Sequence, residues 1–238
     1  MFDFKPDLTK EKIELIHGDG VEFIPEIQKK YGEKMVVVTD PPFNIGYHYN
    51  SYSDKMSEDD YYEMLNKVFG FSPFVVIHYP EEIYKISFST GKFPDRVVAW
   101  VYNSNTSKQH RDIGFFGVKP DFRKYGQPYK NPNDKRVKKL IEQGKKARLY
   151  DWWEINQVKN VSKEKTFHTC QMPLEVMRRI VGILPEDSII VDPFMGSGTT
   201  GIAALQLNRK FVGIDIDYEY VKLADERLGQ ASAESEVD

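Results

Sequence analysis

The sequence predicts an α/β fold with a mostly parallel, doubly wound sheet. Short β-branched runs, of which MVVVT at residues 35–39 is the clearest, alternate along the chain with amphipathic helical segments. A glycine-rich loop at residues 195–201 joins one such run to an alanine-rich helix, which is the strand–turn–helix order of a doubly wound sheet. The length of 238 residues suits one domain with an insertion better than two separate cores.

The elements before residue 103 follow from apolar runs and their end signals. Strands are expected at residues 13–16, 35–39, 74–78 and 96–102, and helices at residues 21–31 and 58–69. Ser57 is expected to cap the second helix, because three acids follow it in the first turn, where the helix dipole favours them. The MVVVT strand is apolar throughout, as in the centre of a parallel sheet, and stops at Asp40-Pro41-Pro42.

The second half contains a loop-rich stretch followed by a return to regular alternation. Residues 103–166 are expected to form an insertion with one short helix near residues 135–143. Helices are then expected at residues 173–182, 199–207 and 218–228, with strands at 189–191 and 211–214. The domain is thus expected to span residues 1–228, and the small, acidic stretch 229–238 is expected to be disordered.

The charge is unevenly distributed. The whole chain carries a net charge of −3, yet residues 100–166 hold 16 Lys/Arg against 7 Asp/Glu. Such a basic segment on an acidic body is expected to contact a polyanion, with a solvated lysine-rich surface as the alternative. The candidate phosphate contacts are Lys108, Arg111, Arg123, Lys124, Lys138, Lys139 and Arg148.

Composition excludes several classes of protein. The apolar runs are far shorter than the ~20 residues that span a bilayer, and the N-terminus has no apolar stretch, so the cytoplasm is the expected location. One cysteine, Cys170, forms neither an internal disulfide nor the usual zinc cluster, and no metal is expected.

The glycine loop predicts a nucleotide-like cofactor. Gly196, Gly198 and Gly201 match G-x-G-x-x-G, and Asp215 ends the next strand, where an acid binds ribose hydroxyls. Glycines are expected here because backbone must approach the ligand closely. Nicotinamide and flavin cofactors and S-adenosylmethionine all fit this pattern. Only one further strand follows the loop, so the remaining strands must come from the N-terminal half, in permuted order.

The turn TDPPF follows the MVVVT strand, at the edge where open α/β sheets bind ligands. Its two prolines fix the backbone and so hold the Asp40 carboxylate, the Pro41 carbonyl and the Phe43 ring in one small volume. The alternative interpretation is a simple helix-breaking turn after a buried strand.

DPPF, DPFMGSGTT, VGIDID followed by YVKLADERL, and HTCQMP together resemble the amino-methylating DNA methyltransferases, in the order where the catalytic motif precedes the cofactor motif. The resemblance covers about 130 residues, from residue 13 to about 100 with gaps, and from 168 to 228. It leaves out the basic segment, which lies where that family carries its target-recognition region. The resemblance implies a prokaryotic or phage enzyme that methylates double-stranded DNA, and it leaves open a homodimer and a cognate restriction endonuclease.

The chemistry of the motif agrees with this resemblance. An adenine amino group is a poor nucleophile, so Asp40 and the Pro41 carbonyl are expected to accept its two N–H bonds while Phe43 stacks on the flipped base, with Pro42 fixing the turn. Transfer from S-adenosylmethionine is then direct and in line. HTCQMP is similar to the family's HPTQKP, with Thr, Cys and Met at three positions. The resemblance assigns the cofactor to Asp19, His168, Gln171, Pro173, Asp192, Phe194, Gly196, Ser197, Gly198, Thr199, Thr200 and Asp215, with Asp217 as the alternative ribose ligand.

Parts of the sequence also fit other functions. Asp before the double proline favours N6 of adenine, and N4 of cytosine is the alternative. Cys170-Gln171 resembles the PCQ nucleophile of C5-cytosine enzymes, but Thr169 replaces its proline. A catalytically silent DNA-binding module, a nicotinamide-dependent oxidoreductase and an RNA substrate are the remaining alternatives.

Overall fold

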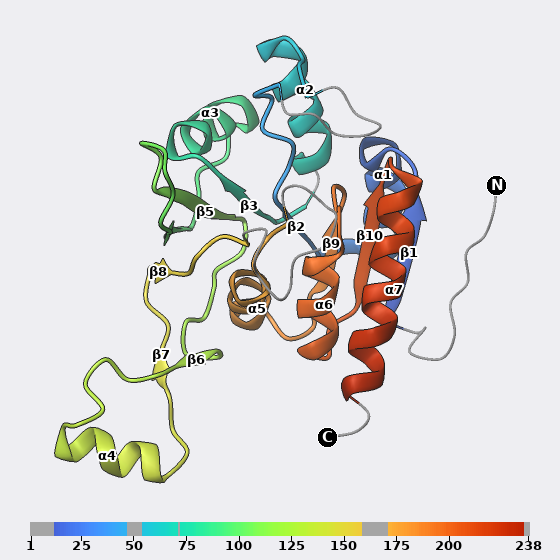
Figure 1. Ribbon diagram of the computed structural model, residues 1–238. Helices are drawn as coiled ribbons and strands as arrows, with labels where there is room; N and C mark the ends of the chain where they lie inside the picture. Colours follow the sequence, from blue (N-terminus) through green and yellow to red (C-terminus); the bar gives the residue numbers. More distant parts are fainter. Residues whose placement is uncertain (1–11, 47–53, 71, 159–170, 236–238) are drawn as a thin grey trace.

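The computed structural model describes residues 12–46, 54–70, 72–158 and 171–235 (Figure 1). Its main sheet has eight strands in the order β1-β10-β9-β2-β3-β5-β4-β8, and β6 pairs with β7 in a separate ribbon. The strands are β1 (Ile13–His17), β2 (Met35–Thr39), β3 (Phe74–His78), β4 (Arg96–Val101), β5 (His110–Phe116), β6 (Gly126–Gln127), β7 (Ala147–Arg148), β8 (Trp152–Glu154), β9 (Ile189–Asp192) and β10 (Phe211–Asp215).

Helices cover both faces of the main sheet, so the predicted doubly wound α/β fold is confirmed (Figure 1). One face packs against α5 (Leu174–Ile183), α6 (Thr199–Gln206) and α7 (Tyr218–Ser235). The other packs against α1 (Gly20–Tyr31), α2 (Glu58–Phe69) and α3 (Pro80–Thr90). A 3-10 turn, η1 (Gly32–Lys34), follows α1, and α4 (Lys135–Glu142) lies away from both faces.

The parallel register brings the two motif-bearing strands together. All neighbouring pairs of the main sheet are parallel except the two that β5 makes with β3 and β4. Strand β2 lies beside β9, although about 150 residues separate them in the chain. Asp40 follows β2 and Asp192 ends β9, so the DPPF turn and the glycine loop meet at the same edge of the sheet.

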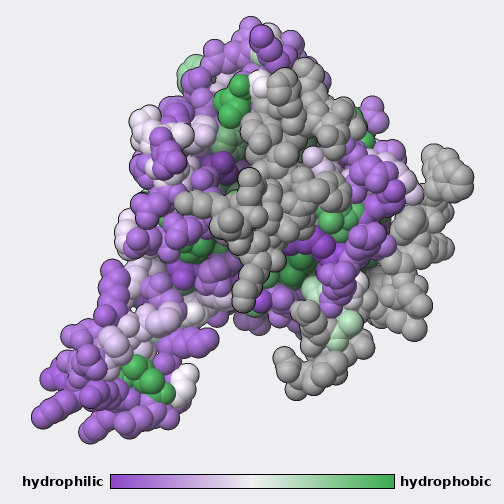
Figure 2. Space-filling view, viewed as in Figure 1, coloured by the Kyte–Doolittle hydropathy of each residue, from purple (hydrophilic) through white to green (hydrophobic). Residues whose placement is uncertain are grey.

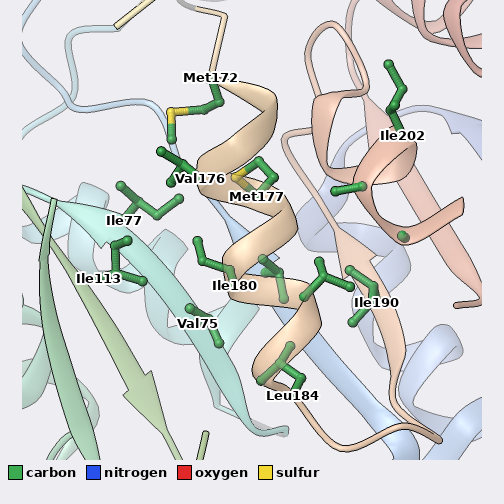
Figure 3. Close-up of a cluster of buried hydrophobic side chains, with 14 of the residues drawn as sticks. Val75, Ile77, Ile113, Met172, Val176, Met177, Ile180, Leu184, Ile190 and Ile202 are labelled. Atoms are coloured by element: carbon green, nitrogen blue, oxygen red, sulfur yellow. The ribbon is translucent and has the colours of Figure 1, made fainter. Parts of the chain in front are cut away.

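Helix α5 shows how the core supports this edge. Val176, Met177 and Ile180 are fully buried against Val75 of β3 and Ile113 of β5 (Figure 3). Burying such side chains stabilises the fold by roughly 1.5–3 kcal/mol each. The cluster therefore fixes the strand ends from which the site residues project.

The structure differs from the expected elements in α3, in the four strands β5 to β8 and in the length of α7. α3 was not expected, and residues 110–116, assigned to the loop-rich insertion, form β5 in the middle of the sheet. α7 continues through Ser235 with Ala231 and Ser232 buried, so the expectation of a disordered tail is wrong for residues 229–235. The last three residues lie outside the described part of the chain.

Residues 126–148, which we call the arm, extend from the body (Figure 1). The arm consists of β6, α4 and β7, and its surface is almost entirely hydrophilic with one small hydrophobic patch (Figure 2). Within the described residues, none of the helices combines the length and apolar character that crossing a membrane requires.

Candidate active site

Asp40 lies just beyond β2 with a side chain that is only 16% exposed. Its Oδ2 is 3.5 Å from Nη1 of Arg111, whereas its buried Oδ1 has no hydrogen-bond partner among the described residues. Burial raises the pKa of Asp40 to about 6, and the charge of Arg111 acts in the opposite direction. Asp40 is therefore mostly ionised at neutral pH, with one oxygen still able to accept a hydrogen bond.

Arg111 projects from β5 into this site, not to the surface as a phosphate contact would. Its guanidinium carbon lies 4.6 Å from the centre of the Phe43 ring and 5.5 Å from that of Trp100. Its Nη1 is 3.8 Å from the sulfur of Met172. The expectation that Arg111 contacts a DNA phosphate from an exposed loop is thus at odds with its place on a central strand, where its side chain is only 16% exposed.

A chain of hydrogen bonds fixes the rest of the DPPF turn. Nδ1 of His78 accepts from the backbone N–H of Tyr79 at 2.8 Å, so the ring proton lies on Nε2, which contacts the hydroxyl of Tyr61 at 3.0 Å. That hydroxyl donates to the carbonyl of Pro42 at 2.8 Å. Burial and, secondarily, the charge of Arg111 lower the pKa of His78 to about 3. The neutral His78 ring also stacks on Phe43, with centroids 4.0 Å apart.

The glycine loop is held by an acid of the neighbouring strand. One carboxylate oxygen of Asp215 accepts from the N–H of Gly196 at 2.8 Å and the other from that of Asp217 at 2.9 Å. Gly196 and Gly198 have φ of 51° and 75°, in the left-handed region that glycine tolerates best. A Cβ on Gly198 would lie 2.8 Å from that of Ala224 on α7. Glycine is therefore needed there for backbone conformation and helix packing, which corrects the expectation that it mainly clears a path to the ligand.

Asp192 joins the two motif strands. Its Oδ1 accepts from the hydroxyl of Thr39 at 2.7 Å and its Oδ2 from that of Thr200 at 2.6 Å. Burial raises the pKa of Asp192 to about 6, against the effect of these hydrogen bonds. The carboxylate thus links the end of β2 to the N-terminus of α6. This structural role was not predicted, since the sequence predicted only a contact between Asp192 and the cofactor.

A cavity lies between the DPPF turn and the glycine loop. It is lined by Asp40, Gln171, Met172, Asp192, Phe194, Met195, Gly196, Ser197, Thr199 and Thr200. Seven expected cofactor residues are among them, namely Gln171, Asp192, Phe194, Gly196, Ser197, Thr199 and Thr200. Gly198 and Asp215 support the loop from behind, and Pro173 begins α5 next to the lining.

The structure describes Asp19 but not the first three residues of the HTCQMP motif. Asp19 caps α1, accepting from the N–H of Val21 at 2.9 Å. The Gly18 N–H donates to the carbonyl of Asp215 at 2.9 Å, so Asp19 lies at the same sheet edge as the glycine loop. His168, Thr169 and Cys170 lie outside the described residues.

The basic candidates fall in different environments. Lys108 pairs with Glu81 and lies 3.7 Å from the centre of the Tyr79 ring, Arg123 pairs with Asp121, and Lys124 pairs with Glu186 at 3.2 Å. The three remaining candidates, Lys138, Lys139 and Arg148, are exposed on the arm. The arm is therefore the part of the predicted recognition segment that presents exposed cations away from the body (Figure 1).

Sequence reasoning missed the residues that support Asp40 and the DPPF turn. Arg111, Tyr61, His78 and Thr39 belong to four different elements, and only Thr39 lies within a short motif, TDPPF. His78 did carry a signal, because it ends an apolar strand as Thr39 does, and such positions face the same sheet edge.

Comparison with known proteins agrees with this geometry. Residues 35–226 match the family of DNA methylases that act at N6 or N4 amino groups. The chain is 28% identical to the type II methyltransferase M.HpaI of Haemophilus parainfluenzae, over 81% of this chain and 67% of that protein. It is 26% identical to the DNA adenine methyltransferase YhdJ of Escherichia coli K12, over 92% and 83%.

Two solved structures share the fold. The M1.HpyAVI–SAM complex superposes with a TM-score of 0.61 at 23% identity, covering 91% of this chain and 98% of that chain. The cytosine-N4-specific PvuII DNA methyltransferase superposes with a TM-score of 0.62 at 16% identity, covering 93% and 92%.

Proposed function

Since the chain belongs to the family of DNA methylases that modify an exocyclic amino group, at N6 of adenine or N4 of cytosine, we propose that it methylates N6 of adenine in double-stranded DNA. S-adenosylmethionine is the proposed methyl donor. The observation that carries the proposal is the position of Asp40, a buried carboxylate with one unpartnered oxygen in the wall of the cavity that the glycine loop also lines.

The residues of the DPPF turn have distinct tasks in this reaction. Asp40 accepts an N–H of the target amino group, which draws the nitrogen lone pair out of conjugation with the ring. Phe43 offers a ring on which the base stacks, an interaction worth about 1–3 kcal/mol per base. The hydrogen bond from Tyr61 holds the Pro42 carbonyl, so the turn keeps its shape when the base arrives.

The residues around the cavity fit the proposed cofactor. Ser197, Thr199 and Thr200 line it at the start of α6, where backbone N–H groups and the helix dipole favour the carboxylate of the methionine part. Asp215 and Asp19 supply acids at the same edge, Asp215 for the ribose and Asp19 for the adenine. When bound, S-adenosylmethionine supplies a sulfonium methyl group whose sulfur is a good leaving group.

Adenine is favoured over cytosine by the acid at position 40. In the family that this chain resembles, Asp usually precedes the double proline in adenine enzymes and Ser in N4-cytosine enzymes. YhdJ, which aligns over most of this chain, is an adenine methyltransferase by name, whereas the PvuII enzyme shows that the same fold also serves cytosine N4. The homodimer and the restriction endonuclease stay predictions of the resemblance.

The test is to express the chain in cells that lack adenine and N4-cytosine methylation and to sequence their DNA by a method that reads both modified bases. We expect N6-methyladenine at one short sequence. Asp40→Ala should abolish this signal and leave S-adenosylmethionine affinity within about threefold, because Asp40 is assigned to the base. Asp59→Ala, which removes an exposed acid of α2, is the matched control.

Each outcome has a clear meaning. N4-methylcytosine would retain the family chemistry and overturn the choice of base. Full activity of Asp40→Ala would overturn the assigned role of the carboxylate. Binding of a nicotinamide dinucleotide instead of S-adenosylmethionine, measured by calorimetry, would overturn the reaction itself.

A further inference from the structure

Arg111 makes the contacts that a target base would have to make. Its N–H donor lies 3.5 Å from the Asp40 carboxylate, and its planar guanidinium lies over the Phe43 ring at 4.6 Å. An adenine in the proposed reaction needs the same two features, an N–H donor toward Asp40 and a flat face on Phe43. The guanidinium and a base cannot both lie on the same face of Phe43, whereas Oδ1 of Asp40 stays open to a base while Oδ2 faces Arg111.

The register of the sheet shows that Arg111 covers the free side of Phe43. His78 pairs with Asp112 across β3 and β5, so these two side chains share one face of the sheet and Arg111 projects to the other. His78 stacks on Phe43 at 4.0 Å with an angle of 18° between the rings, which fills one face of the phenylalanine. The guanidinium therefore takes the side of the ring that His78 leaves open.

Arg111 also has a side-chain hydrogen bond with Tyr102, but two of its features suit a temporary occupant. Its separation from Asp40 is longer than the roughly 2.7–2.9 Å of a strong charge-assisted hydrogen bond. Its Nε is buried without a hydrogen-bond partner among the described residues. An arginine fixed permanently for structural reasons would be expected to satisfy that donor.

We propose that Arg111 is an internal stand-in for the target base, which occupies the base position of the free enzyme and is displaced when the flipped base enters. This inference rests on the proposed function of the Asp40 site. It gives Arg111 a role in substrate selection, because a base must displace the guanidinium from the Phe43 ring before it can react.

The experiment measures base binding without catalysis. Deoxyadenosine is titrated into the full chain by saturation-transfer NMR at about pH 9, where Asp40 stays ionised in the parent and in the variants, with excess S-adenosylhomocysteine present to fill the cofactor cavity. We expect Arg111→Gln to bind deoxyadenosine about threefold or more tightly than the parent, since the competing cation–π contact is lost. The gain should vanish in Arg111→Gln combined with Phe43→Ala, which shows that the nucleoside uses this ring.

Two further variants keep the test decisive. Arg111→Lys retains the charge beside Asp40 but not the flat guanidinium, so it should also bind deoxyadenosine more tightly, and it serves if the glutamine variant does not fold. Lys67→Gln, which removes an exposed cation of α2 that pairs with Glu63, should leave the affinity unchanged. Unchanged or weaker binding in both Arg111 variants would overturn the stand-in.

The result is separable from that of the methylation test. Tighter binding in the Arg111 variants supports the stand-in whether or not methylated DNA is found, because no methyl transfer is needed. Methylated DNA together with unchanged deoxyadenosine binding would retain the proposed function and reject the role of Arg111.

Discussion

Replacing Arg111 by glutamine should move the acidic limb of the pH profile of kcat/KM to higher pH. In the free protein, burial raises the pKa of Asp40 to about 6, and Arg111 opposes that rise. A protonated Asp40 loses the charge that attracts the amino N–H, so activity falls as pH drops through this pKa. The parent should therefore show a limb near pH 6, and removing the opposing cation should raise it.

The size of the shift follows from the geometry of the ion pair. Two unit charges 3.5 Å apart attract by about 5 kcal/mol at an effective dielectric constant of about 20. Water that enters beside glutamine recovers part of this, and a neighbouring opposite charge typically shifts a carboxyl pKa by about 1–3 units. We expect a shift of about 1–2 units, so that kcat/KM at pH 7 falls by about two- to tenfold and recovers only above the raised pKa.

The assay compares the two kinetic parameters over pH 5 to 9 at constant ionic strength. The pH dependence of kcat/KM reports the free enzyme, whereas that of kcat reports the complex, from which the stand-in has been displaced. Arg111→Gln should thus shift the limb of kcat/KM while leaving that of kcat in place. Lys67→Gln is the control and should shift neither. Equal shifts in both parameters would refute displacement, and no shift in either would refute the coupling to Asp40.

Three further predictions concern the turn, the loop and the arm. Tyr61→Phe removes the hydrogen bonds to Pro42 and His78, so it should lower the free energy of unfolding, measured by urea denaturation, by about 1–3 kcal/mol. It should also reduce kcat severalfold, while the cofactor affinity measured by calorimetry stays unchanged. Gly198→Val should lower the melting temperature as well as cofactor affinity, because its side chain meets α7 at a positive φ; a stable variant that merely fails to bind would contradict this packing. Reversing the charges of Lys138, Lys139 and Arg148 should flatten the salt dependence of DNA affinity by about 0.9 per lost phosphate contact, and an unchanged slope in duplex titrations would mean that the arm is only a solvated surface.

Most strands and helices could be predicted because their ends carry chemical signals. Strand β2 has the predicted bounds, since its apolar run stops at two prolines. Helix α2 begins after Ser57, whose hydroxyl accepts from the Asp60 N–H as a cap should. At such positions local propensity and tertiary packing favour the same structure.

Strand β5 was not predicted because its local sequence does not have the pattern of a buried strand. HRDIGFF begins with three polar residues and contains a glycine, within a segment dominated by lysines and turn residues. Its burial depends on antiparallel pairing with β3 and β4, which no local pattern specifies. Helix α3 did have a start signal, namely Pro80 in the first turn followed by two acids, and the prediction overlooked it.

The candidate site was predictable where its residues belong to motifs. Turns after parallel strands meet at one sheet edge, so DPPF and the glycine loop could be placed together from sequence order alone. The partners within the site could not, because Asp192 bonds to Thr39 and Thr200, and Asp215 bonds to the loop backbone, through contacts that depend on the register.

Arg111 shows why a segment's net charge is a weak guide to its partners. The net charge counts every cation of the segment equally, although their environments differ. Arg111 is buried beside Asp40, and Lys108 is paired with Glu81. The cations of α4 form no ion pair with a described acid. A phosphate gains most from a cation that no acid already neutralises. The arm therefore holds the cations best suited to a nucleic-acid backbone, whereas the cation that sequence placed among them lies where the base itself would react.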